Sequence, residues 1–274
     1  MQWIQCVVYG LLSGFTEFLP VSSNAHQILF RELFGMEFCP LLDLFVHLAS
    51  LFALLIGNRT VLVRIQREKL RYRRMRRSRN PRSAASALYD SRLVMTATIP
   101  MMIVLLLQYV TISTVKTPLM VLFLIVNGII MLVPEHMRHA NKNAQSMSGL
   151  DGIFMGLFGG LSALPGISRN GAVAAFAVAR GADRQCAVDW ALLLSIPALI
   201  VLVVLDLTAI ISTGVGEISF VIVLSYIMAA LAAALGGYLS IRLIRFMAVH
   251  LDFSGFAYYS LGVALFSFVL YLIT

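Results

Sequence analysis

Residues 10–26 read GLLSGFTEFLPVSSNAH, and residues 156–172 read GLFGGLSALPGISRNGA. Both stretches follow the pattern G-L-x-x-G-x-[ST], then L-P, then S-x-N, and they lie about half a chain length apart. In each stretch a Pro-Ser break separates two apolar segments that are too short to cross a bilayer alone. Such a pair of interrupted segments is typical of re-entrant helices in transporter-like folds built from inverted repeats. The sequence therefore predicts two homologous halves, each beginning with a broken helix pair.

Composition places the chain in a membrane. Of its 274 residues, 59% are hydrophobic and 12% are charged, whereas a soluble domain is about one quarter charged. The apolar runs are long and do not alternate with polar residues, which favours helices and excludes a β-barrel. The three cysteines form no CxxC pair and predict neither a disulfide framework nor a zinc site. We expect an all-α integral membrane protein.

The expected architecture is one membrane domain with six transmembrane helices and two re-entrant hairpins. The first repeat, 1–134, would contain the re-entrant pair 3–34, the spans 41–57, 93–113 and 118–134, and a basic loop at 58–92. The second repeat, 150–274, would contain the re-entrant pair 150–180 and the spans 185–206, 217–240 and 253–273.

Positive charge indicates the orientation. Residues 59–92 hold 12 of the 21 Lys and Arg residues, so the loop is expected on the cytoplasmic side. The first re-entrant pair then enters from outside and the second from inside, so the repeats are inverted. Their broken tips are expected to meet near the bilayer midplane.

The polar residues at the two breaks predict an anion site. Backbone N–H groups left unpaired at membrane depth must line a polar cavity. We expect Ser22 and Ser23 to cap the helix that follows them, as Ser168 would in the second copy. Two helix N-termini that point at each other, with a buried arginine, favour phosphate. The candidate phosphate-binding residues are Ser22, Asn24, Ser168, Arg169, Asn170 and Gly171.

The motifs TEFLPVSSNAH and PGISRNG, in a basic chain with six spans, resemble those of the undecaprenyl-diphosphatase family, the bacitracin-resistance type. The resemblance covers nearly the whole chain. It implies a phosphatase of the bacterial inner membrane that converts undecaprenyl diphosphate to the monophosphate and recycles the lipid carrier of cell-wall synthesis. It also implies a divalent cation, Mg²⁺ or Ca²⁺, and a site that opens to the outer face.

The resemblance assigns roles by position. Ser23 matches the serine proposed as nucleophile, and His26, one helical turn later, would take its proton. Glu17 matches an acidic residue that would bind the cation or act as a base, and Asp43 matches a second acidic position that would share the cation. Ser168 and Arg169 match the serine and arginine of the second motif.

The chain also departs from the family pattern. Ser13 stands where the family has an acidic residue or Gln, and His47 stands where it has Gln. The remaining departures are Asn170, Val173 and Tyr258, which replace a Ser, a Thr and an Arg. Loss of a carboxylate weakens a site for a hard cation, and loss of an arginine weakens stabilisation of a transferring phosphoryl group. His47, one turn from Asp43 on the same helical face, and Ser13 are the candidates to compensate.

Several alternatives stay open. Ser22 and Ser23 could serve only as caps, His26 could be a packing residue, and Asp43 and His47 could pair only with each other. The rival function is a polyprenyl-phosphate transporter or flippase with the same fold and little or no phosphatase activity. Expected partners are a polyprenyl diphosphate or phosphate, membrane lipids and a second copy in a homodimer, but no nucleic acid.

Overall fold

The computed structural model describes residues 3–77, 89–111, 117–137, 146–214, 219–250 and 253–273. Every regular element in these ranges is helical, and six helical segments are long and apolar enough to cross a membrane. These segments are Pro40–Gly57, Asp90–Leu107, Thr117–His136, Arg184–Thr213, Phe220–His250 and Ser254–Ile273. The prediction of an all-α, multi-pass membrane protein is confirmed.

The α-helices are α1 (Trp3–Glu17), α2 (Ser23–Phe34), α3 (Pro40–Gly57), α4 (Arg59–Arg77), α6 (Tyr89–Thr111), α7 (Thr117–Leu132), α8 (Gly149–Gly160), α9 (Arg169–Ala179), α10 (Arg184–Thr213), α11 (Phe220–His250) and α12 (Ser254–Ile273). Two short 3₁₀ turns, η1 (Val133–His136) and η2 (Leu161–Ala163), follow α7 and α8. Helices α10 and α11 run past the predicted ends at 206 and 240, and two charged residues near those ends have partners on other helices: Asp206 pairs with His47, and Arg245 pairs with Asp189.

The basic segment was expected to be a loop, and this is wrong for residues 59–77, which form α4. The segment contains neither Gly nor Pro and is rich in Arg, which is a good helix former. Only Asn58 separates α3 from α4, and Arg245 of α11 bonds to its side chain and donates to the Gly57 carbonyl at 2.7 Å. Residues 78–88 lie outside the described part of the chain, and the cytoplasmic placement stays a prediction.

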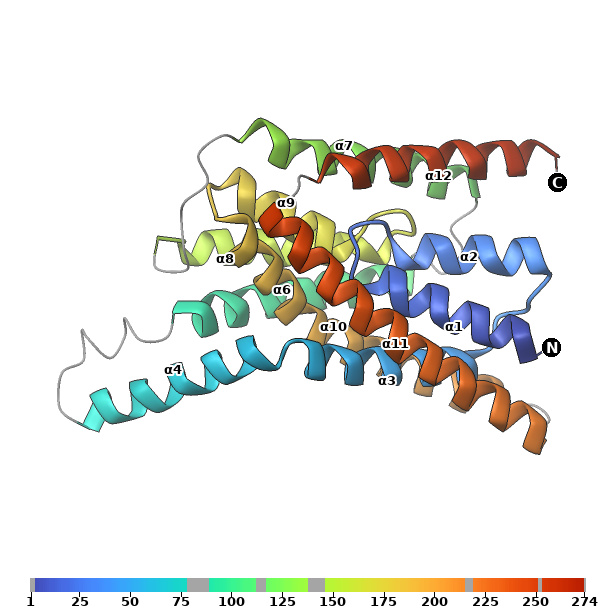
Figure 1. Ribbon diagram of the computed structural model, residues 1–274, viewed down its shortest axis with the longest axis horizontal. Helices are drawn as coiled ribbons and strands as arrows, with labels where there is room; N and C mark the ends of the chain where they lie inside the picture. The colour runs from blue at the N-terminus through green and yellow to red at the C-terminus, as the bar shows by residue number, and fades with distance from the viewer. Residues whose placement is uncertain are drawn as a thin grey trace.

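Both predicted breaks are present. Helices α1 and α2 are separated at residues 18–22, and α8 and α9 at residues 161–168. Figure 1 shows the α1–α2 pair extending toward the end of the molecule that holds the N-terminus, and the α8–α9 pair extending toward the opposite end. The breaks therefore face each other in the middle of the molecule. Re-entry into the bilayer and the limits of the two repeats stay predictions.

The two broken pairs are packed in a reciprocal way. Helix α1 packs on α11 of the second half, and α8 packs on α6 of the first. A Cβ on Gly14 would lie 2.1 Å from the Ala233 carbonyl oxygen, and a Cβ on Gly156 would lie 2.1 Å from the Ala97 carbonyl oxygen. The shared glycine pattern thus allows each first half-helix to approach its partner backbone closely. Helices α3 and α10 pack together, as do α7 and α12 (Figure 1).

Candidate functional site

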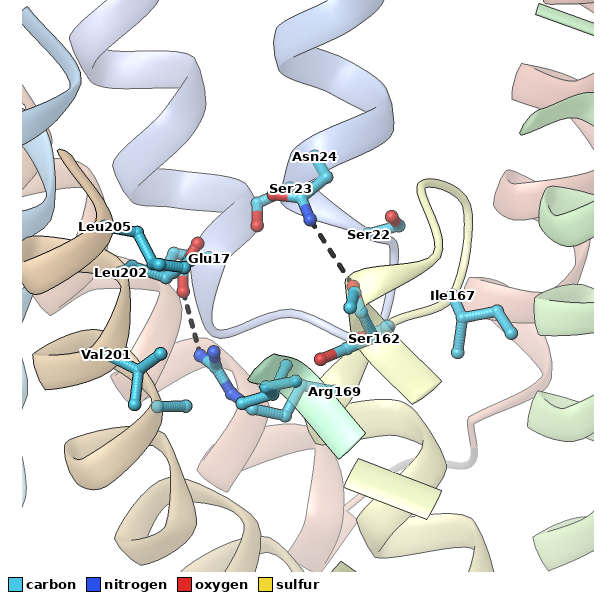
Figure 2. Close-up of a pocket in the computed structure, with 14 residues that line it drawn as sticks. Glu17, Ser22, Ser23, Asn24, Ser162, Ile167, Arg169, Val201, Leu202 and Leu205 are labelled. Atoms are coloured by element: carbon cyan, nitrogen blue, oxygen red, sulfur yellow. Dashed lines mark hydrogen bonds and ion pairs between the residues drawn. The ribbon is translucent and has the colours of Figure 1, made fainter. Parts of the chain in front are cut away.

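The two breaks enclose a cavity of about 140 Å³, shown in Figure 2. One wall is polar and comes from the breaks. The other wall is apolar and comes from α6 and α10, through Leu105, Ala198, Val201, Leu202 and Leu205. Six residues predicted from the sequence line this single cavity: Glu17, Ser22, Ser23, Asn24, Ser168 and Arg169.

The last residue of α1 and the first residue of α9 form an ion pair in this cavity. Arg169 donates from Nη2 to Glu17 Oε1 at 2.8 Å, and their side chains are 7% and 3% exposed. Arg169 also donates from Nε to Ser195 Oγ at 3.3 Å. A buried charge without a partner is very costly, so each group compensates the charge of the other. The hydrogen bonds found among the described residues leave further guanidinium N–H donors for an anion.

The N-terminus of α9 is capped as predicted. Ser168 Oγ accepts the Gly171 backbone N–H at 3.2 Å and donates to the Leu19 carbonyl of the other break at 3.1 Å. The cap fixes the start of α9, and with it Arg169, beside the first break.

The N-terminus of α2 is not capped as predicted. Ser22 occupies the cap position, but its backbone is left-handed, with φ 67°, and its side chain makes no cap hydrogen bond. Instead, Ser22 Oγ accepts the Gly166 backbone N–H of the opposite break at 3.0 Å. The left-handed turn directs the hydroxyl away from its own helix. The first turn of α2 therefore faces the cavity without a side-chain cap and is available to an anion.

The expected contact between Ser23 and His26 is wrong. His26 Nδ1 lies 2.8 Å from the Ser22 carbonyl oxygen, and Nε2 lies 2.8 Å from the Tyr259 hydroxyl. Both contacts fit the neutral tautomer with the proton on Nδ1, in which Nδ1–H donates to the Ser22 carbonyl and Nε2 accepts the Tyr259 O–H. Both ring nitrogens are thus engaged away from Ser23, and His26 does not line the cavity.

Asp43 and His47 line a second cavity of about 220 Å³, which shares Asn24, Leu202 and Leu205 with the first. The alternative that they pair only with each other is wrong. Asp43 binds Arg31 at 2.5 Å, and His47 binds Asp206 at 2.6 Å. Each group has a nearer partner on another helix, α2 for Asp43 and α10 for His47.

The remaining predicted residues lie outside the cavity. Asn170 donates to the Glu17 carbonyl at 3.2 Å and accepts from Ser195 at 2.7 Å, so it joins α1 to α10. Gly171 packs against Pro20 and Met131 behind the site. The residues noted as departures are also away from it: Ser13 is buried in α1, Val173 belongs to the hydrophobic core, and Tyr258 is 69% exposed.

The sequence reasoning missed Asn127, which is fully buried on α7 and bonds to both breaks. Its Nδ2 donates to the Pro20 carbonyl at 3.0 Å, and its Oδ1 accepts the Ser168 backbone N–H at 2.9 Å. The signal was visible as a single amide in the apolar span 118–134, because a polar group in such a segment needs internal partners. The other missed contacts to the site region come from Ser162, Ser195, Asp206 and Tyr259.

The sequence is similar to known proteins over almost its full length. The family described as "Bacitracin resistance protein BacA" matches residues 6–266. "Undecaprenyl-diphosphatase 1" of Shouchella clausii is 33% identical over 254 residues, which cover 89% of each chain. The undecaprenyl-diphosphatases of Carboxydothermus hydrogenoformans and Methanobrevibacter smithii are 31% and 32% identical, and each alignment covers 94% of both chains.

Proposed function

Because the chain belongs to the bacitracin resistance protein BacA family, we propose that it hydrolyses undecaprenyl diphosphate to undecaprenyl phosphate and inorganic phosphate. Its relatives are named for this activity. The reaction would recycle the lipid carrier for cell-wall synthesis. The observation that supports it best is the buried Glu17–Arg169 pair between two converging helix N-termini.

The cavity suits an amphiphilic diphosphate. The positive ends of α2 and α9 and the spare N–H donors of Arg169 would bind the phosphate oxygens. The apolar wall on α6 and α10 would receive the first part of the lipid tail. One cavity with a charged side and an apolar side therefore accommodates both parts of the substrate.

Ser23 is the proposed nucleophile because it lies at the start of α2 and lines the cavity. Its Oγ would form a bond to the terminal phosphorus as the bond to the bridging oxygen breaks, and undecaprenyl phosphate would leave with that oxygen. Water would then release phosphate from the serine. Since His26 is engaged elsewhere, Glu17, which lines the same cavity, would accept the serine proton when it does not bind a cation. Phosphoryl transfer depends mainly on positioning and charge stabilisation, which the helix ends and Arg169 would provide.

A divalent cation, Mg²⁺ or Ca²⁺, is compatible with this site when substrate is present. Within the described residues no group of three His, Cys, Asp or Glu side chains is arranged so that it could hold a metal ion by itself, and Asp43 lines the neighbouring cavity rather than this one. Mg²⁺ commonly binds through one or two carboxylates together with substrate phosphates. Glu17 would hold the ion with serine hydroxyls nearby, and the ion would neutralise phosphate charge.

The test is phosphate release by the purified protein from undecaprenyl diphosphate in detergent. We expect Ser23→Ala and Arg169→Ala each to lower the rate by about 10²–10³-fold, whereas Tyr258→Phe, on the exposed face, leaves it unchanged. Transbilayer movement of polyprenyl phosphate in proteoliposomes, without phosphate release, would instead establish the transporter. The names of the relatives do not favour that alternative.

The proposed location is the bacterial inner membrane. The basic helix α4 would lie on the cytoplasmic side, and the site would open to the outer face. The cytoplasmic placement of α4 is supported by the positive charge of residues 59–92. A homodimer stays a prediction.

A further inference from the structure

Tyr259 on α12 contacts His26 in two ways. Its hydroxyl lies 2.8 Å from His26 Nε2, and the two rings stack with centroids 5.6 Å apart and an interplanar angle of 6°. Helix α12 is the last helix of the chain, and it lies beside α7 rather than within either broken pair (Figure 1). The contact therefore links the end of the chain to the first break.

The other side of the His26 ring supports a strained turn. Its Nδ1–H donates to the carbonyl of Ser22 at 2.8 Å, the one non-glycine residue with a positive φ among those the structure describes. A left-handed backbone is unfavourable for a residue with a Cβ and persists only where its surroundings hold it. The Ser22 side chain is held by the Gly166 N–H, and its carbonyl is held by His26.

The backbone turn at Ser22 determines how the side chains of Ser22 and Ser23 are presented to the cavity. Ser22 and Ser23 both line it, and Ser23 is the first residue of α2. A rotation of the Ser22 carbonyl would move the peptide bond that joins these residues, and with it the nucleophile proposed above. The Ser22 carbonyl also accepts the His26 backbone N–H at 3.4 Å, but the ring nitrogen is the nearer donor, at 2.8 Å.

We propose that Tyr259 is a positioning residue, which acts through His26 to hold Ser23 in its reactive position. By donating to Nε2, the Tyr259 hydroxyl keeps the ring in the tautomer with the proton on Nδ1. That tautomer is the one that can donate to the Ser22 carbonyl. The part of the inference that concerns turnover rests on the proposed phosphatase activity, whereas the effect on the tautomer does not.

The test compares Tyr259→Phe with Tyr258→Phe, a matched change at the neighbouring tyrosine, which is 69% exposed. Tyr259→Phe removes one oxygen and keeps the stacked ring. Loss of one hydrogen bond that positions the nucleophile is expected to lower kcat by about tenfold, with KM within about twofold, because substrate binding groups are unchanged. Tyr258→Phe is expected to change neither constant.

A spectroscopic measurement tests the tautomer directly. The protein is labelled with ¹⁵N-histidine, and the His26 signals are assigned by their loss in the His26→Gln variant. These signals should show a single Nδ1–H tautomer in the wild type and a mixture of tautomers in Tyr259→Phe. An unchanged tautomer, or equal loss of kcat in the Tyr258→Phe control, would overturn the proposal. A wild-type protein that releases no phosphate would refute the proposed function, and the tautomer measurement would still decide the role of Tyr259.

Discussion

Replacement of Arg169 by Met offers the sharpest test of the central ion pair. The variant keeps a side chain of similar length but leaves the Glu17 carboxylate, 3% exposed, without its cationic partner. Removing one member of a buried pair typically costs about 3–5 kcal/mol, because the remaining charge stays buried and uncompensated. We expect Arg169→Met to lower the thermal unfolding midpoint strongly and to abolish phosphate release.

The double variant Glu17→Leu/Arg169→Met separates stability from function. Replacement of both members of a buried ion pair by apolar groups is often neutral or stabilising. The double variant should therefore recover most of the stability that the single variant loses. It should remain inactive, because both groups of the proposed chemistry are gone.

Thermal unfolding in detergent gives the midpoints when it is monitored by the fluorescence of Trp190, which is buried on α10. Phosphate release gives the activity. Arg180→Met is the control, since the Arg180 side chain is 54% exposed, and its partner Asp151, 8% exposed, keeps its hydrogen bonds from Ser148 in this variant. A pair with one solvent-exposed member is expected to contribute less stability than the central pair, in which both side chains are buried. The reasoning is refuted if the double variant is as unstable as Arg169→Met, or if it retains wild-type phosphate release.

Three further predictions follow from individual contacts. Gly14→Ala would place its Cβ 2.1 Å from a carbonyl oxygen of α11 and should destabilise the protein by about 1–3 kcal/mol or more. The control is Gly262→Ala, whose Cβ would have no atom within 4 Å and which should not lower the unfolding midpoint. Ser22→Ala leaves the Gly166 N–H without its acceptor and should cost about 1–3 kcal/mol, measured as a lower midpoint with slower phosphate release. Asn127→Leu removes hydrogen bonds to both breaks and should lower the unfolding midpoint and the rate of phosphate release together. Full activity in this variant would contradict the structural role assigned to the amide.

The position of the site could be predicted because its residues are unusual in their surroundings. Glu17, Ser23 and Arg169 interrupt apolar sequence, and polar groups at that depth must share a cavity. The duplicated pattern then indicated that the two interruptions belong together. Residue type and position along the chain were enough for this inference.

The choice of partners could not be predicted in the same way. Asp43 and His47 lie on one face of α3, yet Arg31 and Asp206 reach them from other helices. Those contacts depend on how the helices pack, which spacing along one helix does not determine. The direction of the Ser22 hydroxyl depends on a single backbone angle, and sequence patterns for capping assume an ordinary extended residue at that position.

The hydrogen bonds at the breaks explain why the site needs both halves of the chain. The Gly166 N–H of the second break is satisfied by Ser22 of the first, and the Leu19 carbonyl of the first is satisfied by Ser168 of the second. Neither break satisfies these groups by itself, and a buried backbone group left unpaired costs about 1–3 kcal/mol. The same exchange brings Arg169 to Glu17, so the contacts that stabilise the broken helices also assemble the charges proposed to bind the diphosphate. A change that separates the breaks should therefore reduce stability and catalysis together, whereas a change confined to Ser23 should reduce catalysis alone.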